Sequence, residues 1–287
     1  MLYLKYARSS LVALALASGG GEAQTREGVS FDQTITSVSS AAGRYDSTTN
    51  ILHMVAAGNA SRIEMENNSI YPAMGTFTPG PHTIVLMHGG GAEIVFLNPD
   101  KKEYLSIKPV EMMSGFRKMI EGMGGSMVFD TANSHIGFDS LGAGQIMDGH
   151  QTVHYRIDAA MKMTISMMGQ VVTSESQSTT DVFSAPDLAQ YRDVVDAMSG
   201  FGQLRESMGM GGDFFRKVRE NQRKAVGFPL RMVMHTVQTQ QGKTRTVTQT
   251  IDSRNVRPIS LADSVFAIPA GYKPISLPVV PGAAGVN

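Results

Sequence analysis

The sequence has no cysteine and no tryptophan among its 287 residues, and it has no excess of one charge. Without cysteine there can be no disulfide bond, no thiolate metal site, no cysteine nucleophile and no lipid anchor on a cysteine. Its 25 basic and 25 acidic side chains balance, and no basic stripe indicates a nucleic-acid partner. No apolar run reaches the roughly 20 residues that a membrane-spanning helix needs, so no transmembrane segment is expected.

The first 23 residues have the pattern of a secretory signal peptide. Lys5 and Arg8 form a positive start, a short apolar run follows at 11–17, and small residues precede Gln24. Cleavage at this point predicts a periplasmic or secreted protein whose mature chain begins near Gln24. At the other end, residues 276–287 are rich in Pro, Gly and Ala, which predicts a disordered tail.

Methionine is abundant, with 20 residues. Its flexible, polarizable side chain suits an adaptable apolar binding surface, but it also fills cores. Both interpretations remain open from composition alone.

Alternating apolar and polar residues predict a sheet-rich domain. The clearest strand follows a Gly-rich approach and a turn at Asp148-Gly149. Its two faces are Val153, Tyr155 and Ile157 on one side, and Thr152, His154 and Arg156 on the other. We expect the first set to face the predicted helices, and His154 and Arg156 to face outward, because successive side chains of a strand point to opposite sides.

Further strands and two helical zones are predicted along the chain. The expected strands are 29–38, 50–55, 61–66, 83–87, 93–97, 103–107, 127–138, 160–168, 179–184, 229–237 and 243–251. Turns are expected at Gly58-Asn59 and Gln241-Gly242. Apolar residues at helical spacing predict one helix over 109–123 and a helical insert at about 186–224.

Several short pieces, in this order, resemble small secreted bacterial proteins of unknown function that are related to the Lol-type (LolA- and LolB-like) lipoprotein carriers. The pieces are Arg62 to Glu64, Asn98 to Tyr104, Gly144 to Ile157, Gly227 to Arg231 and Phe266 to Tyr272. The resemblance implies an α+β fold for a single domain over 24–275: a strongly curved antiparallel sheet, an open half-barrel, with helices packed on its concave side. It also implies that the concavity holds acyl chains, and it supplies no catalytic residue.

An apolar cavity between the helices and the sheet is the site that follows. The residues expected to line it are Met112, Phe116, Met119, Met123, Tyr155, Tyr191, Met198 and Phe214. The alternative is that these side chains simply fill the concave side. Arg62 is a candidate for binding an anionic headgroup if it lies on the concave face, although a paired surface position beside Glu64 and Glu66 is the simpler interpretation.

The other polar motifs do not predict catalysis or metal binding. His150 and His154 are separated by roughly 13 Å in a strand, too far to bind one ion. Gly89 to Gly91 lacks the Lys-Ser/Thr pair and the helix of a phosphate-binding loop. No serine lies in a Gly-x-Ser-x-Gly turn.

The sequence therefore favours a non-catalytic binding or carrier protein for a hydrophobic client, either a lipid or an acylated protein, without cofactor or metal. The alternative is a structural or stress-related envelope protein that binds another protein and has a filled core. A hydrolase with an unrecognised site is a third hypothesis. The sequence does not indicate an oligomeric state.

Overall fold

The computed structural model describes residues 25–66, 77–130, 133–167, 169–192, 217, 220–221 and 224–276. The expected signal peptide, nearly all of the expected tail, and Met198 and Phe214 lie outside these residues.

Strands dominate the described part of the chain. The strands are β1 (Thr25–Ala41), β2 (Arg44–Ala57), β3 (Ala60–Met65), β4 (Ile84–His88), β5 (Glu93–Asn98), β6 (Glu103–Ile107), β7 (Ser126–Phe129), β8 (His135–Met147), β9 (His150–Met167), β10 (Gln170–Ala185), β11 (Phe228–Gln240), β12 (Lys243–Ala262) and β13 (Lys273–Ile275). The described helices are α1 (Pro109–Gly122) and two short 3-10 helices, η1 (Pro186–Tyr191) and η2 (Asp263–Phe266).

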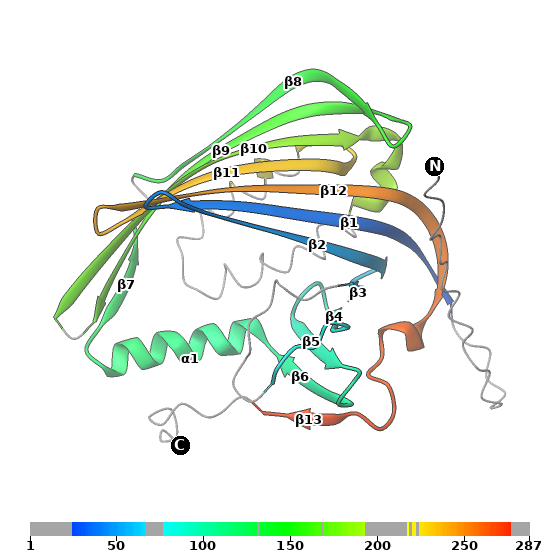
Figure 1. Cartoon of the computed structure of the whole chain (residues 1–287), viewed down its shortest axis with the longest axis horizontal. Coiled ribbons are helices and arrows are strands. Elements are labelled where there is room, and N and C mark those ends of the chain that lie inside the picture. Colours follow the sequence, from blue (N-terminus) through cyan, green and yellow to red (C-terminus); the bar gives the residue numbers. More distant parts are fainter. Residues whose placement is uncertain are drawn as a thin grey trace, which may run out of the picture.

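All thirteen strands form one open, strongly curved sheet (Figure 1). Its order is β13-β6-β5-β4-β3-β2-β1-β12-β11-β10-β9-β7, and β8 pairs with β9. The sheet is mixed, because β13 runs parallel to β6 while the other pairs are antiparallel. The predicted α+β class is therefore wrong: the described residues form a nearly all-β protein.

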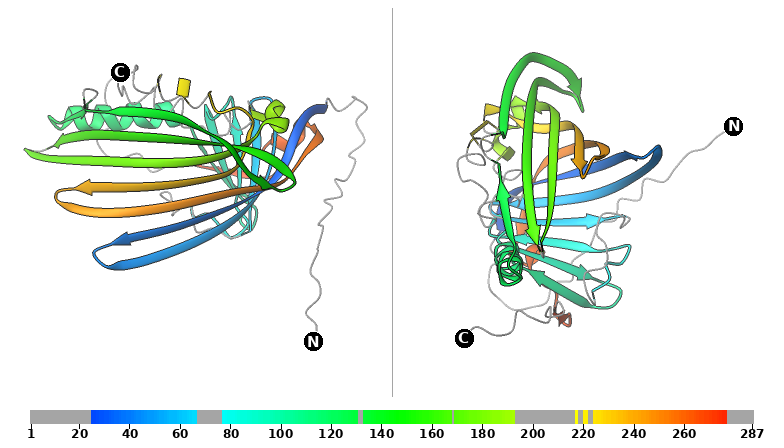
Figure 2. Two further views of the ribbon diagram at one scale, coloured as in Figure 1. Left: turned by 90° about the horizontal axis from the view of Figure 1, so that it is seen from above. Right: turned by 90° about the vertical axis from the view of Figure 1, so that its left-hand side faces the viewer.

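Three long hairpins, β1–β2, β9–β10 and β11–β12, project in the same direction (Figure 2). We call the end of the sheet at their turns the distal end, and the opposite end, beside β3 to β6, the proximal end. In the turns Ala42-Gly43 and Gln241-Gly242 both residues have positive φ. This conformation matches the twist of two-residue hairpins. The predicted turns at Gln241-Gly242 and Asp148-Gly149 are confirmed.

The proximal end contains the main core on its concave face. Sixteen buried residues belong to this cluster, including Phe31 of β1, Phe228 of β11 and Phe96 of β5. The rings of Phe31 and Phe228 meet edge to face at 5.1 Å. Because the sheet curls, strands that are far apart in the sheet order contribute to the same core.

The convex face of the proximal end is also covered. The chain after β12 crosses this face. Its Phe266 is buried in a cluster with Leu261, and its Ile268 and Tyr272 pack against a cluster that includes the fully buried Leu86 and Leu97. As a result β4 and β5 are buried on both faces, which accounts for their continuous apolar runs.

Of the described helices, η1 packs against the proximal core on the concave face, but α1 does not cover this face as predicted. The predicted helix is present as α1, but it lies along the edge of the sheet beside β7, where Ile120 is buried near Gly125 (Figure 2). Of the predicted insert at 186–224, the structure describes η1 as a 3-10 helix and isolated helical residues from 217 onward. The prediction was wrong because the curled strands fill the proximal concave side with their own side chains.

Candidate functional site on the concave face

The concave face continues from the proximal core toward the distal end through one row of directly opposed residues. The row consists of Ile35, Ile251, Met232, Val182 and Tyr155 on five adjacent strands. Ile35 packs against the main core, so the whole row lies on the concave side. Residues two, four or six positions further along each strand share this face.

Tyr155 anchors a second, smaller cluster on this face. Its ring stacks with that of Phe138 at 5.5 Å, and it is buried with Val182 and Ala225. The Tyr155 hydroxyl accepts a hydrogen bond of 3.2 Å from the backbone N–H of Val226. Tyr155 therefore faces the concave side of the sheet, but its described neighbours there come from strands and from residues 225–226 rather than from α1 as predicted.

Beyond this cluster an apolar strip follows β9 and its neighbours toward the distal end. We define the apolar strip as Met127, Phe129, Ile136, Ala159, Met161, Met163, Ile165 and Val172. Its members are only partly buried, unlike the same face of the proximal end. The strip is confined to β7, β8, β9 and the start of β10, since serine occupies this face of β10 at Ser174, Ser176 and Ser178.

Charged side chains on the distal concave face gather at two hairpin turns. Arg44 and Arg245 both lie directly opposite Ala41, and Lys243 and Asp46 are two residues away along β12 and β2. These four side chains are exposed and form no ion pair with any residue that the structure describes. The charges therefore remain available to a ligand or to solvent.

The opposite, convex face is polar and internally paired. Asp181 accepts hydrogen bonds from Arg156 at 2.9 Å and contacts His154 at 2.8 Å, while the His154 ring stacks on Phe183 at 4.3 Å. Lys162 pairs with Glu175 at 2.9 Å, and this hydrogen bond raises the pKa of Lys162. His154 and Arg156 thus face outward, as predicted.

A histidine links three elements on the convex side of the proximal end. His53 contacts Asp32 at 2.7 Å and Glu66 at 3.0 Å, one through each ring nitrogen. Asp32 also accepts a hydrogen bond from the Asn255 amide at 2.7 Å. Burial alone would lower the pKa of His53, but the two carboxylates outweigh it and raise the pKa above its ordinary value.

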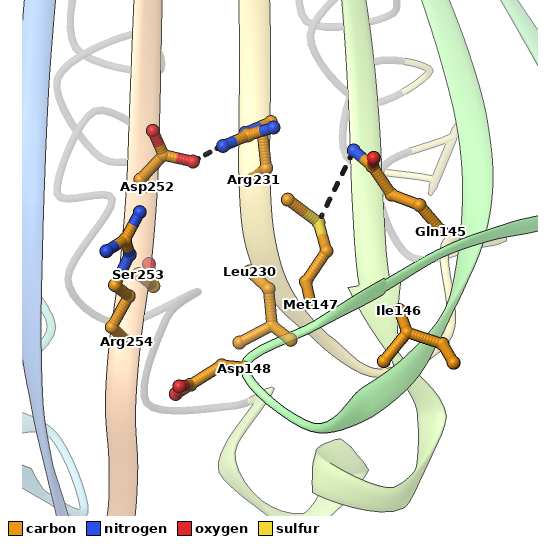
Figure 3. Close-up of a pocket in the computed structure, with 9 residues that line it drawn as sticks. All are labelled: Gln145, Ile146, Met147, Asp148, Leu230, Arg231, Asp252, Ser253 and Arg254. Carbon is orange, nitrogen blue, oxygen red and sulfur yellow. Dashed lines mark hydrogen bonds and ion pairs between the residues drawn. The ribbon is translucent and has the colours of Figure 1, made fainter.

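A hollow of about 330 Å³ lies between the β8–β9 turn and strands β11 and β12 (Figure 3). The ion pair of Arg231 and Asp252, 2.5 Å long, forms one wall, and Met147 and Leu230 lie beside it. This hollow was not predictable from the sequence, because its walls come together only where the β8–β9 turn crosses over two distant strands. Arg231 and Asp252 satisfy each other's charge, and Asp148 accepts a hydrogen bond from the backbone N–H of Asn255 at 2.7 Å. We assign the hollow no ligand.

The structure distributes the predicted cavity residues over separate places. Met112, Phe116 and Met119 lie in α1, and Met123 follows it, with Met112 47% and Met123 38% exposed. Tyr191 packs against the proximal core, whereas Tyr155 belongs to the smaller cluster.

Arg62 lies on the convex face, away from the apolar strip. Its guanidinium pairs with Glu64 at 2.8 Å and donates a hydrogen bond to the Val265 carbonyl at 3.4 Å. The two histidines of the HxxxH motif also have different partners, since His150 contacts Asp187 at 2.6 Å and His154 contacts Asp181.

The residues that the sequence analysis missed are the strip members Met127, Met161 and Met163. The sequence does indicate Met161 and Met163, because the alternation of apolar residues that starts at Val153 continues through both of them to Met167. Dividing this stretch into two strands at 159–160 concealed it, whereas the structure shows one uninterrupted strand.

Comparison with known proteins shows no family membership. No family model matches the sequence, and no curated protein is significantly similar to it. A crystal structure of PNGF-II has 11% identity and a TM-score of 0.30, covering 86% of this chain and 31% of the other, so this chain spans about a third of that protein. A domain from Vibrio parahaemolyticus, provisionally described as an outer membrane lipoprotein-sorting protein domain, has 10% identity and a TM-score of 0.28, covering 84% of this chain and 89% of the other. Scores this low carry no argument about function.

Within the part of the chain that the structure describes, no helix combines the length and apolarity that crossing a membrane requires.

Proposed function

We propose that this protein binds an apolar client, a lipid or the acyl chain of a modified protein, on the apolar strip, and that it does so without catalysis. The observation that carries the proposal is the partial exposure of the strip on the same face that forms the core at the proximal end. Apolar side chains that stay accessible on a concave surface gain free energy when a ligand removes them from water.

The composition of the strip supports an acyl chain as the client. Met127, Met161 and Met163 lie on adjacent strands, and their flexible side chains adapt to a chain without fixed shape. Ile165 and Phe129 continue the same surface. The N-terminal pattern supports a periplasmic or secreted location for this binding.

The proposal is tested with a pair of adjacent substitutions in β9. Met163 faces the strip, whereas Thr164 lies on the convex face, so Met163→Glu and Thr164→Glu place the same carboxylate on opposite sides of one strand. Binding of the apolar fluorescent probe 1-N-phenylnaphthylamine is measured for both variants and the unchanged protein. We expect Met163→Glu to weaken binding about tenfold or more, because burying an unpaired charge is costly, and Thr164→Glu to leave it unchanged.

Circular dichroism and urea denaturation of each variant establish that the fold is retained. Failure of the unchanged protein to bind the probe, or equal binding by both variants, would contradict the proposal. The first result would favour the alternative of a protein-interaction module with a filled concave side.

A further inference from the structure

The distal concave face changes character in one direction across the sheet. One row of directly opposed residues crosses six strands, from β2 to β9. The row reads Arg44, Ala41, Arg245, Gln238, Ser176 and Met161. It begins with cationic side chains, continues with neutral polar side chains and ends on the apolar strip.

We propose that Arg44 and Arg245 bind the anionic head of an amphipathic lipid whose acyl chain lies on the apolar strip. This inference rests on the proposed function and adds the class of ligand to it. The order of side chains along the row matches the order of groups in such a lipid: an anionic head, a neutral polar linker and an apolar chain.

The two arginines are placed to act on one anion. They flank Ala41 on neighbouring strands, so their backbones lie about 10 Å apart at the usual spacing between strands. The methyl group of Ala41 leaves the space between them open, and both long side chains can converge above it. Guanidinium groups bind carboxylates and phosphates through paired hydrogen bonds.

The distance to the apolar strip also fits. Arg245 and Met161 are three strands apart in the row, about 14 Å along the sheet. Gln238 and Ser176 occupy the interval and offer hydrogen bonds to ester or hydroxyl groups. An acyl chain of medium length, anchored at the arginines, therefore reaches the strip.

The charged residues of this site lack described ion-pair partners, whereas three cations of the convex face have them. On the convex face, Arg156, Lys162 and Arg231 each have a carboxylate partner within 3 Å. On the distal concave face the four charged residues, three basic and one acidic, give a net charge of +2, and none of them has an ion-pair partner among the described residues. An anionic ligand would supply the missing partner for the arginines.

The test compares three probes with the same alkyl chain: dodecanoate, dodecyl phosphate and dodecan-1-ol. Affinities are measured by displacement of 1-N-phenylnaphthylamine at low ionic strength, where charge contributes most. The unchanged protein should bind at least one charged probe about tenfold more tightly than the alcohol, as expected for hydrogen bonds to charged groups. The preferred charged probe distinguishes a phosphate head from a carboxylate head.

The variant Arg44→Gln/Arg245→Gln should lose this preference while it keeps its affinity for dodecan-1-ol. The matched control is Lys162→Gln, which removes a cation from the convex face and should retain the preference. If the unchanged protein binds all three probes equally, or if the double variant keeps the preference, the headgroup site is wrong and the proposed function stands. If none of the three probes binds, the proposed function itself fails.

Discussion

The proximal and distal ends of the sheet are built largely from the same strands, but they bury their faces to different degrees. At the proximal end both faces are covered, and Val29, Phe228 and Leu97 are almost inaccessible to solvent. At the distal end, the convex face is polar and the concave face carries apolar side chains that remain partly exposed. Stability therefore comes mainly from the proximal end, and the distal end is the part available to a ligand.

This difference follows from what packs against each part of the sheet. The proximal end receives strands β3 to β6 on its curled concave side and the chain after β12 on its convex side. The distal end consists of three hairpins flanked by β7 and the start of β8, and its described contacts are mainly between neighbouring strands. Strands of this kind retain an accessible face, and on the concave side of β7 and β9 that face is apolar.

The largest difference in the free energy of unfolding is expected between two truncations on the concave face, one at each end of the sheet. Phe228→Ala should lower the free energy of unfolding by about 3–5 kcal/mol, because it removes a fully buried ring from the proximal core. Met163→Ala should cost about 1 kcal/mol, since this side chain is partly exposed. Urea denaturation measures both. Equal losses would show that the distal strip is as much a part of the core as Phe228.

A smaller difference in stability is expected between alanine substitutions at two glycines of positive φ. A methyl group on Gly227, at the proximal start of β11, would come within 2.3 Å of the Ala185 carbonyl oxygen. Gly242, in the distal turn, has open space around it. We expect Gly227→Ala to destabilise the protein by at least about 2 kcal/mol and Gly242→Ala by about 1 kcal/mol, the usual cost of this conformation. Thermal unfolding of the two variants measures both losses of stability. A larger loss for Gly242→Ala than for Gly227→Ala would show that the proximal end tolerates the added methyl group.

The smallest expected effect concerns the histidine network of the proximal convex face. The pKa of His53 is higher in the folded protein than in the unfolded chain, so its stabilising effect is complete below the unfolded pKa of about 6.5 and is lost as pH rises through the folded pKa. His53→Gln should therefore destabilise the protein more at pH 5.5 than at pH 8.5. The difference should stay below about 1 kcal/mol, because the side chains are half exposed.

The measurement is urea denaturation of both proteins at the two pH values. A larger loss at pH 8.5 than at pH 5.5 would mean that the imidazolium form does not hold Asp32 and Glu66 together. His235→Gln is a suitable control, since His235 contacts a threonine hydroxyl rather than a carboxylate.

The local structure was largely predictable from the sequence. Alternation at Val153, Tyr155 and Ile157 identified the face of β9, and glycines identified the turns at Gly149 and Gly242. These features depend on interactions within a few residues, so the sequence expresses them directly.

The full length of the hairpins was harder to predict. Only residues 179–184 of β10 were expected as a strand, yet β10 spans Gln170–Ala185. Its middle is rich in serine, and a strand with polar residues on both faces has no apolar alternation to reveal it. The pairing with β9 and β11 supplies the stabilisation that the local sequence lacks.

The location of the apolar strip was not predicted. Methionine abundance left a core filler and an adaptable apolar surface both open, and the structure places the partly exposed Met127, Met161 and Met163 on β7 and β9 rather than on the helices. The pair Arg44 and Arg245 could not be predicted, because the two residues are brought together only by the pairing of β1 with both β2 and β12.

The position of β1 has a consequence for how the chain reaches this fold. β1 is the earliest strand that the structure describes, yet it lies in the middle of the sheet. Its partner β12 follows it by more than 200 residues in the sequence. The ion pair between Arg26 and Asp263 joins residues that are 237 positions apart. Contacts at such separation form slowly, because a long loop must close before they are gained. A ribosome that has not yet made β12 therefore holds a chain whose central strand β1 has an open edge. The two ends of the sheet can become one cooperative unit only after β11 and β12 have been synthesised.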